Sequence, residues 1–286
     1  MRDLEALVVA AYVFADEYRV AARQGRPGLV SDAELVALAV AQAAIGISSD
    51  RQFLGLVGRV LPGWFPHLRE VAVQPAPTQP GRVDLDRAAA PGPLGRRWWR
   101  PACRRHPACG RQLSRLPAAI RVRRLRPLWL LQVAAPLVWG VRLVLLTDRR
   151  GLPLGYTIVP ANEKEYEPLA DLLTGTPAEV VIADKGLWGR GYRERLAACG
   201  TALLTPDKSR TAANLGRERA LASLRLVIES VFANLKGQMR LAQHLAKTPA
   251  GLAVRIAQRI LALTIGVLLN TLAGRPARAL AAYDGR

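Results

Sequence analysis

The sequence has 286 residues, of which half are hydrophobic, so it can form one large domain or two modest ones with a substantial core. A formal net charge of +19 would ordinarily favour a polyanionic partner such as DNA, because lysine and arginine displace counterions from phosphates. Most of this charge belongs to one segment, described below, so DNA binding must be argued from motifs instead. The three cysteines are too few and too irregularly spaced for a disulfide framework or a zinc site, and the first residues lack the basic region and cleavage site of a signal peptide.

Helical periodicity dominates the first seventy residues. Helices are expected over residues 2–22, 32–45 and 49–60. Ser31 precedes the second helix as a predicted N-cap, and Pro62-Gly63 ends the third. Three apolar side chains after the third helix should pack against it: Trp64, Phe65 and Leu68. This helical region is expected to be either a DNA-end-binding module of helix-turn-helix type or a packing domain.

The segment from residue 71 to residue 137 differs from the rest in composition. It holds half of the twenty prolines, thirteen arginines, no lysine and two acids, Asp84 and Asp86, so it supplies +11 of the net charge and leaves +8 to the remainder. Its pattern has neither helical nor strand periodicity. Three explanations are open: a disordered basic linker, an arginine-rich DNA-binding insertion, and translation in the wrong reading frame. We favour the last, because three tryptophans and an apolar run do not suit a solvated linker.

After this segment the chain alternates between strand and helix patterns. Residues 138–146 and 152–160 are apolar runs on either side of the turn letters Asp148-Arg149-Arg150-Gly151, which predicts a β-hairpin. One helix and two short buried strands should follow: 162–173, 179–184 and 201–206. The apolar run 260–272, bounded by Arg259, is shorter than the ~20 residues of a membrane span and predicts a buried core helix.

Acidic and basic side chains at two places indicate chemistry on phosphodiesters. Asp184 ends a predicted strand and is followed by Lys185, so its carboxylate is expected at the carboxyl end of a buried strand. Glu229 lies on a helical segment, where at ~100° per residue it shares a polar line with Arg225 and Lys236. Carboxylates beside cations suit divalent metal binding. On the residues alone, Asp184 could instead cap a loop, and Glu229 could be a surface partner of Arg225.

Four motifs in this part of the chain resemble those of the DDE transposases of bacterial insertion sequences, which have a ribonuclease H-like catalytic fold. They are the hairpin end TDRRGLP, the segment PANEKEYEPL, the block ADKGLWGRGY, and the spacing Arg225-x3-Glu229-x6-Lys236. The resemblance covers roughly residue 138 to the C-terminus, and more faintly the helical N-terminus. It implies an α/β fold: a helical N-terminal region, then a ribonuclease H-like mixed sheet flanked by helices, with C-terminal helices.

The resemblance also implies roles for the singled-out residues. Asp184 and Glu229 would be catalytic and would hold Mg²⁺ or Mn²⁺, while Arg225, Lys236 and Lys185 would contact DNA phosphates. The substrates would be DNA, first the ends of the element and then a target. Such a transposase is expected to be a homodimer, cytoplasmic and nucleoid-associated, with no membrane partner.

The expected domains follow from these patterns and from the resemblance. They are a helical N-terminal region over 1–70, the anomalous segment over 71–137, a catalytic domain over 138–275 and a tail over 276–286.

The third carboxylate of such a site is missing from its expected place. The resemblance puts the first catalytic aspartate on the strand before residue 138, yet no Asp or Glu occurs from Arg87 to Thr147. Asp148 is near in sequence, but as the first residue of a turn it is expected to bond its own backbone. We therefore expect a transposase that is inactive as written. The alternatives are a non-catalytic DNA-binding relic that competes for element ends, and another ribonuclease H-like nuclease.

Overall fold

The computed structural model describes residues 2–18, 29–68, 140–162, 166–183, 190–205 and 212–285. They form a mixed α/β chain that is mostly helical. The chain divides into two compact units. Unit 1 comprises Met1–Ala89, Arg150–Leu152 and Ser230–Arg286, and unit 2 comprises Ala90–Arg149 and Pro153–Glu229. The anomalous segment over 71–137 lies outside the described residues, so the domain boundaries drawn from the sequence stay predictions.

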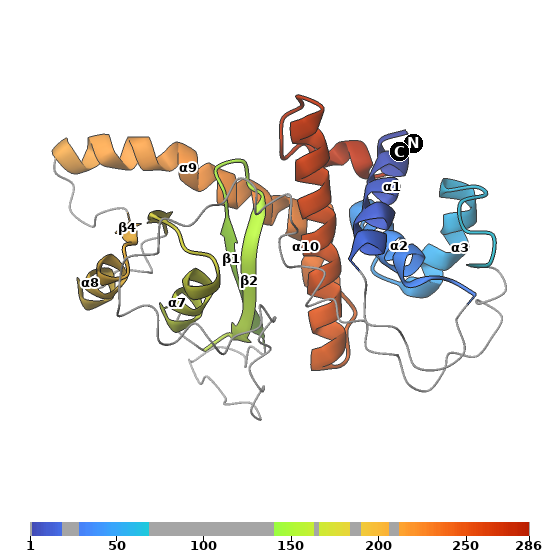
Figure 1. Cartoon of the computed structure of the whole chain (residues 1–286), viewed down its shortest axis with the longest axis horizontal. Coiled ribbons are helices and arrows are strands. Elements are labelled where there is room, and N and C mark those ends of the chain that lie inside the picture. Colours follow the sequence, from blue (N-terminus) through green and yellow to red (C-terminus); the bar gives the residue numbers. More distant parts are fainter. Residues whose placement is uncertain are drawn as a thin grey trace, which may run out of the picture. The chain divides into compact units, whose positions relative to one another are not determined.

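Unit 1 is built from helices around α10 (Pro249–Leu272). This helix packs against α1 (Arg2–Glu17) and α2 (Asp32–Ile45), and the short 3₁₀ helices η3 (Leu241–Gln243) and η4 (Leu280–Tyr283) also contact it (Figure 1). Six of the largest fully buried side chains of the described residues come from α1, α2 and α10: Leu4, Leu7, Val8, Val40, Leu263 and Val267. Each such side chain contributes roughly 1.5–3 kcal/mol through burial, so this core holds the helices together.

Local signals set the ends of the second and third helices as predicted. The Ser31 hydroxyl accepts a hydrogen bond from the Glu34 N–H at 3.2 Å, and the Glu34 carboxylate accepts one from the Ser31 N–H at 2.6 Å. This capping box satisfies backbone donors that the helix itself leaves unpaired. The helix α2 ends at Gly46, whose φ of 78° is left-handed, and α3 (Asp50–Val60) begins at the cap Ser49. The predicted cap and both helices are confirmed.

One expectation for this region, the packing of Trp64, is wrong, and another, the end of the first helix, falls on residues that are not described. Trp64 was expected to pack down the third helix, but its side chain is exposed to 38%. Leu68, which was expected to pack there as well, is 8% exposed and is confirmed as buried, and Leu61 at the end of the helix is 2% exposed. The first helix ends at Glu17, and its predicted end at residue 22 lies outside the described residues.

The buried C-terminal helix is also confirmed, but it is longer than its apolar run. It begins at Pro249, where the Thr248 hydroxyl accepts from the Gly251 N–H at 3.0 Å, and its length and composition would suffice to cross a membrane. Of its most apolar 18-residue window, 56% is buried within the protein. Core helices of soluble proteins have the same composition, and this burial favours the core-helix interpretation.

The described part of unit 2 begins with the predicted hairpin. The strands β1 (Val141–Thr147) and β2 (Pro153–Pro160) pair antiparallel, with Val144 opposite Thr157 and an irregularity between Leu146 and Thr147. The helix α7 (Tyr166–Gly175) packs against both strands. Its predicted start, Asn162, lies in a turn, and residues 163–165 are outside the described part of the chain.

The rest of unit 2 is a parallel β-α-β arrangement. The strands β3 (Val180–Ile182) and β4 (Ala202–Leu204) pair in parallel and are connected through α8 (Arg190–Ala198). A small core holds α7, α8 and these strands together: Leu169, Leu173, Val181, Tyr192, Leu196 and Leu203. Both short strands are thus confirmed. In the described part of the chain the strands form two separate two-stranded sheets, and the single ribonuclease H-like mixed sheet stays a prediction.

The helix α9 (Ala212–Lys236) runs through both units, because the division falls between Glu229 and Ser230. Val231 and Leu235 of this helix are fully buried and belong to unit 1. After the helix, the Gln238 side chain donates to the carbonyl oxygens of Ala44 and Leu280, both at 2.9 Å. These bonds fix the turn after α9 to the end of α2.

Candidate catalytic site

The residue before Asp184 lies at the carboxyl end of a parallel strand pair in unit 2. Ala183 follows β3 and still donates from its N–H to the Leu204 carbonyl at 3.0 Å, so the pairing continues to the residue before Asp184. The side chains of Asp184 and Lys185 lie outside the described residues. The carboxyl ends of parallel strands are where α/β proteins commonly place their sites, and the chain reaches Asp184 in that position.

A cation that the sequence interpretation missed lies at the same end of the strand pair. Thr205 follows β4 and is almost fully buried, and its hydroxyl accepts a hydrogen bond from the guanidinium of Arg193 on α8. The Nε of Arg193 is buried, and no partner for it occurs among the described residues. A single arginine on a short amphipathic helix gives no signal in a sequence, so this contact could be found only from the fold.

Tyr192, which precedes Arg193 in the sequence, is a core residue, and its hydroxyl is not a general acid for catalysis. Its hydroxyl donates to the Tyr166 carbonyl at 3.0 Å, and the two rings are 4.8 Å apart between centroids. Burial raises the pKa of Tyr192 to about 12, with a smaller opposing effect from Arg195. The phenol therefore stays neutral and anchors α8 to α7.

Glu229 lies on α9 with an exposed carboxylate. Its side chain is 60% exposed, and its Oε1 lies 4.0 Å from Nη2 of Arg225, one helical turn earlier. The predicted proximity of Glu229 and Arg225 is confirmed. At 4.0 Å and this exposure the pair is loose and contributes little to stability, so the carboxylate oxygens remain accessible to a cation.

Lys236 lies at the end of the same helix. Its Nζ is 5.7 Å from the centroid of the Phe232 ring, and its side chain is exposed. This contact holds the lysine by a cation–π interaction, which is weak at an exposed site, about 0.5–1 kcal/mol. A phosphate could displace it, and the role of Lys236 in DNA contact stays a prediction.

The metal ligands expected from the sequence are Asp184 and Glu229. Within the described ranges, no group of three His, Cys, Asp or Glu side chains is close enough to hold a metal ion. Glu229 offers the hard oxygen donors that Mg²⁺ prefers, and Asp184, the second predicted ligand, is outside those ranges. Asp148 directly follows β1 at the start of the hairpin turn, where it was expected. Cys199 is an exposed free thiol, while Cys103 and Cys109 fall outside the described residues.

Comparison with known proteins gives one match. Residues 138–265 match a family model described as a transposase DDE domain. No curated protein and no solved structure matched the chain. The matched range begins at the predicted hairpin and includes Asp184, Arg225, Glu229 and Lys236, which agrees with the motifs quoted from the sequence. Residues 138–265 are thus similar to a transposase DDE domain, and this similarity supports a DDE-type transposase.

Proposed function

We propose that the protein is an insertion-sequence transposase that is inactive as written, because it lacks the first of its three catalytic carboxylates. One observation carries this proposal. A chain whose residues 138–265 match a transposase DDE domain has no Asp or Glu between Arg87 and Thr147, where the first aspartate is expected. The remaining acids, Asp184 and Glu229, are then two ligands of a site that needs three.

The chemistry of a complete site explains the roles of the residues that remain. Mg²⁺ or Mn²⁺ would polarise the scissile phosphodiester and lower the pKa of the attacking water or 3′-hydroxyl. In this chain Asp184 and Glu229 would hold the metal, and the exposed carboxylate of Glu229 supports that role. Arg225, Lys185 and Lys236 would hold phosphate oxygens of the element end in place.

Charge shows why one missing carboxylate matters. Two divalent ions at ~4 Å separation carry four positive charges, and two carboxylates neutralise only half of them. At least one ion is then bound weakly, and the attacking oxygen is poorly positioned. Because each ~1.4 kcal/mol in the barrier changes the rate tenfold, loss of a ligand can remove several orders of magnitude.

A comparison of two versions of the protein tests the proposal. The first is the present chain, and the second is a frame-corrected chain that regains an aspartate before residue 138. Both are incubated with Mg²⁺ and a plasmid that carries the ends of the encoding element. We expect nicking and strand transfer by the corrected chain alone, and Glu229→Gln should abolish them there. Comparable activity of the present chain would contradict the proposal and make Asp148, Asp84 or Asp86 the third ligand.

Two alternatives are separated by the same assay. A non-catalytic relic that competes for element ends is favoured by the missing carboxylate, and it would inhibit the corrected protein when mixed with it. Another nuclease of this fold would nick DNA without joining it to a target. We further propose a homodimer located in the cytoplasm at the nucleoid, which sedimentation and cell imaging would test.

A further inference from the structure

An arginine of α8 bonds the carboxyl end of β4, and this geometry points to a role in the site: we propose that Arg193 is a positioning residue, which holds the strand ends that lead to Asp184. Its guanidinium donates to the hydroxyl of Thr205, the residue that follows β4. The helix α8 packs beside β4 in unit 2 (Figure 1). The inference rests on the proposed function, in which Asp184 is a metal ligand.

The register of the parallel strands places Thr205 beside the residue before Asp184. Ile182 is opposite Leu204, and the Ala183 N–H donates to the Leu204 carbonyl at 3.0 Å, so the next residues along the two strands are Ala183 and Thr205. Neighbouring strands lie about 4.8 Å apart. Because Thr205 is 1% exposed, the bond from Arg193 fixes the end of β4 from inside the protein. A displacement of this end would move the backbone that continues into Asp184.

The position of Arg193 on α8 directs its side chain to this place. It lies in the first turn of the helix, and helical side chains lean toward the N-terminus of their helix. Six residues connect the end of β3 to the start of α8, and Asp184 is the first of them. A guanidinium that leans toward the start of α8 therefore lies between β4 and the connection that begins with Asp184.

No carboxylate neutralises Arg193 within the part of the chain that the structure describes. The two acids nearest to it along and beside α8 pair with other arginines, Glu194 with Arg190 at 3.4 Å and Glu167 with Arg195 at 3.9 Å. Both of these pairs are exposed. The charge of Arg193 is thus not used in an ion pair of the helix surface.

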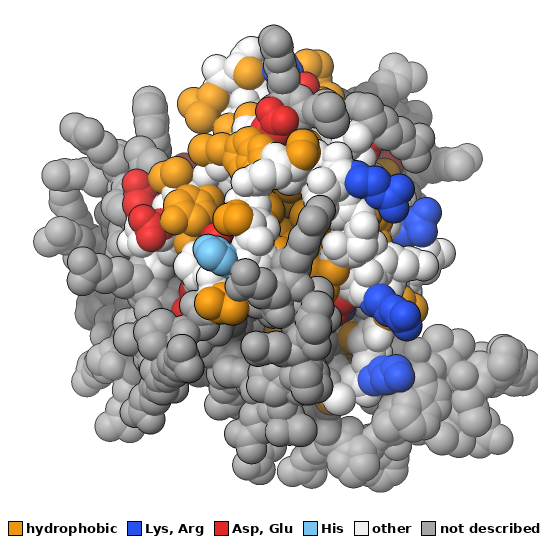
Figure 2. Space-filling model, turned by 90° about the vertical axis from the view of Figure 1, so that its right-hand side faces the viewer, with side chains coloured by type: hydrophobic (Ala, Val, Ile, Leu, Met, Phe, Trp, Pro, Cys, Tyr) orange, Lys and Arg blue, Asp and Glu red, His pale blue; other side chains and the backbone are white. Residues whose placement is uncertain are grey.

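The guanidinium also has a donor to spare. The Lys and Arg side chains drawn in Figure 2 lie on the molecular surface, where water can accept from their N–H groups. The Nε of Arg193 is buried, and among the described residues nothing accepts from it. A buried N–H without an acceptor is unfavourable. This donor can bond a backbone carbonyl when Asp184 binds a metal ion, and that bond would favour the metal-bound arrangement.

The contact leaves the carboxylate of Asp184 free for a metal ion. Successive side chains of a strand point to opposite faces. Leu203 and Ala183 pack in the core that α8 shares with the strands, and Thr205, two residues after Leu203, meets Arg193 on the same face. Continued strand geometry would direct the Asp184 side chain to the other face. Arg193 would then hold the backbone without competing for the carboxylate.

Mn²⁺ binding by the full chain, followed through the relaxation of water protons, tests this role. Asp184→Asn is the reference, because it removes the ligand. We expect Arg193→Lys, which keeps the charge but loses the fork of donors, to weaken Mn²⁺ binding about 10-fold, as is usual for residues that orient a metal ligand. Thr205→Val should do the same, and Thr205→Ser should bind as the wild type. Arg195→Lys makes the same change at an exposed arginine of α8 and is the matched control.

Amide hydrogen exchange without metal separates positioning from stability. The exchange of the Ala183 N–H reports on the end of the strand pair, because this group donates to Leu204. Arg193→Lys should speed it about 10-fold, which corresponds to one hydrogen bond of a charged group. Amides of α7, which belongs to the same core, should exchange as in the wild type.

The outcomes separate this inference from the proposed function. Wild-type Mn²⁺ affinity in Arg193→Lys and Thr205→Val, with loss of binding in Asp184→Asn, would overturn the inference alone. Faster exchange throughout α7 at wild-type Mn²⁺ affinity would also overturn it and make Arg193 a purely structural residue. Equal results for the wild type and Asp184→Asn would remove Asp184 as a ligand, and the inference with it. The proposed inactivity is decided separately, by the nicking comparison.

Discussion

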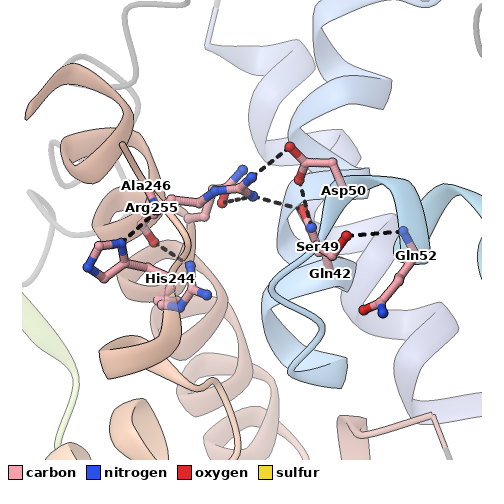
Figure 3. A network of polar contacts seen from close by, with 9 residues as sticks. Gln42, Ser49, Asp50, Gln52, His244, Ala246 and Arg255 are labelled. Atoms are coloured by element: carbon pink, nitrogen blue, oxygen red, sulfur yellow. Dashed lines mark hydrogen bonds and ion pairs between the residues drawn. The ribbon is translucent and has the colours of Figure 1, made fainter. Parts of the chain in front are cut away.

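His244 is half-buried in the turn between α9 and α10, where it is influenced by the charge of Arg259, a buried residue of α10. Arg259 is 3% exposed, and its guanidinium donates to the carbonyl oxygens of Met239 and Arg255, both at 2.8 Å (the network beside it is drawn in Figure 3). Burial lowers the pKa of Arg259 to about 10, with a further lowering by Arg255 and an opposing effect of Asp50. The carbonyl contacts hold a charge inside unit 1, and that charge in turn acts on His244.

A pH dependence of stability follows from this arrangement. Burial lowers the pKa of His244 below its usual 6.5, and the charges of Arg259 and Arg255 lower it further. Between the folded pKa and 6.5 the unfolded chain binds more protons than the folded one, so stability is full above 6.5 and is lost as the pH falls through the folded pKa. Protonation also removes the acceptor at Nδ1 that receives the Ala246 N–H at 3.0 Å. We expect the urea midpoint to fall between about pH 7 and about pH 5.

The variant His244→Gln should remove most of this pH dependence, because glutamine keeps an acceptor for the Ala246 N–H but does not titrate. As a control, His67→Gln changes an exposed histidine and should leave the pH dependence of the urea midpoint as in the wild type. Equal pH profiles for wild type and His244→Gln would show that other groups cause the effect.

Between α2 and α3, the structure depends on a glycine at the turn. Gly46 has a φ of 78°, and a Cβ there would collide with the carbonyl oxygen of Gln238. The backbone of Gln238 cannot retreat freely, because its side chain donates to Ala44 and Leu280. The turn thus fixes the angle between α2 and α3, and this angle depends on a residue almost two hundred positions later in the chain.

Gly46→Ala is expected to lower the free energy of unfolding of unit 1 by at least about 3 kcal/mol, as the left-handed conformation and the collision act together. Gly63 offers a matched control. Its φ is 80°, yet a Cβ there would meet nothing within 4 Å, so Gly63→Ala should lose only the conformational part, about 1 kcal/mol. Urea unfolding of the two variants measures the difference. Equal losses would mean that the collision relaxes without cost.

How much of the whole molecule the sequence could predict depends on the range of each signal. Ser31 with Glu34, and the turn from Asp148 to Gly151, act over a few residues, so the capped helix and the hairpin were predictable. The proximity of Arg225 and Glu229 follows from helical spacing alone. Contacts set by the tertiary fold were not predictable.

Arg193 meets Thr205 only because α8 packs beside β4, and Gly46 meets Gln238 only because α9 ends at α2. Trp64 was wrongly expected in the core because hydrophobicity does not show which apolar side chain takes the available space. The same limit applies to the first catalytic aspartate. A family pattern predicts its strand, but residues 71–137 provide no local signal for it.

At the scale of the molecule, the two units have separate cores, although α9 passes through both. One core contains side chains of α1, α2 and α10, and the other contains Leu196 and the five apolar side chains around it. Residues unfold cooperatively when they share buried contacts, and the continuity of a helix does not decide this. Each unit should therefore have its own free energy of unfolding. The helix would then melt in two parts that meet near Glu229.

Amide hydrogen exchange in two variants tests this division. Leu196→Ala removes a buried side chain from unit 2 and should lower its stability by about 2–5 kcal/mol, which speeds exchange in α7, β3, α8 and β4. Exchange in α1, α2 and α10 should stay as in the wild type. Gly46→Ala should give the reverse pattern, with faster exchange in α10 and from Ser230 onward in α9. If either variant accelerates exchange across the whole described chain, the units unfold together and Glu229 lies within one cooperative body, not at the border of two.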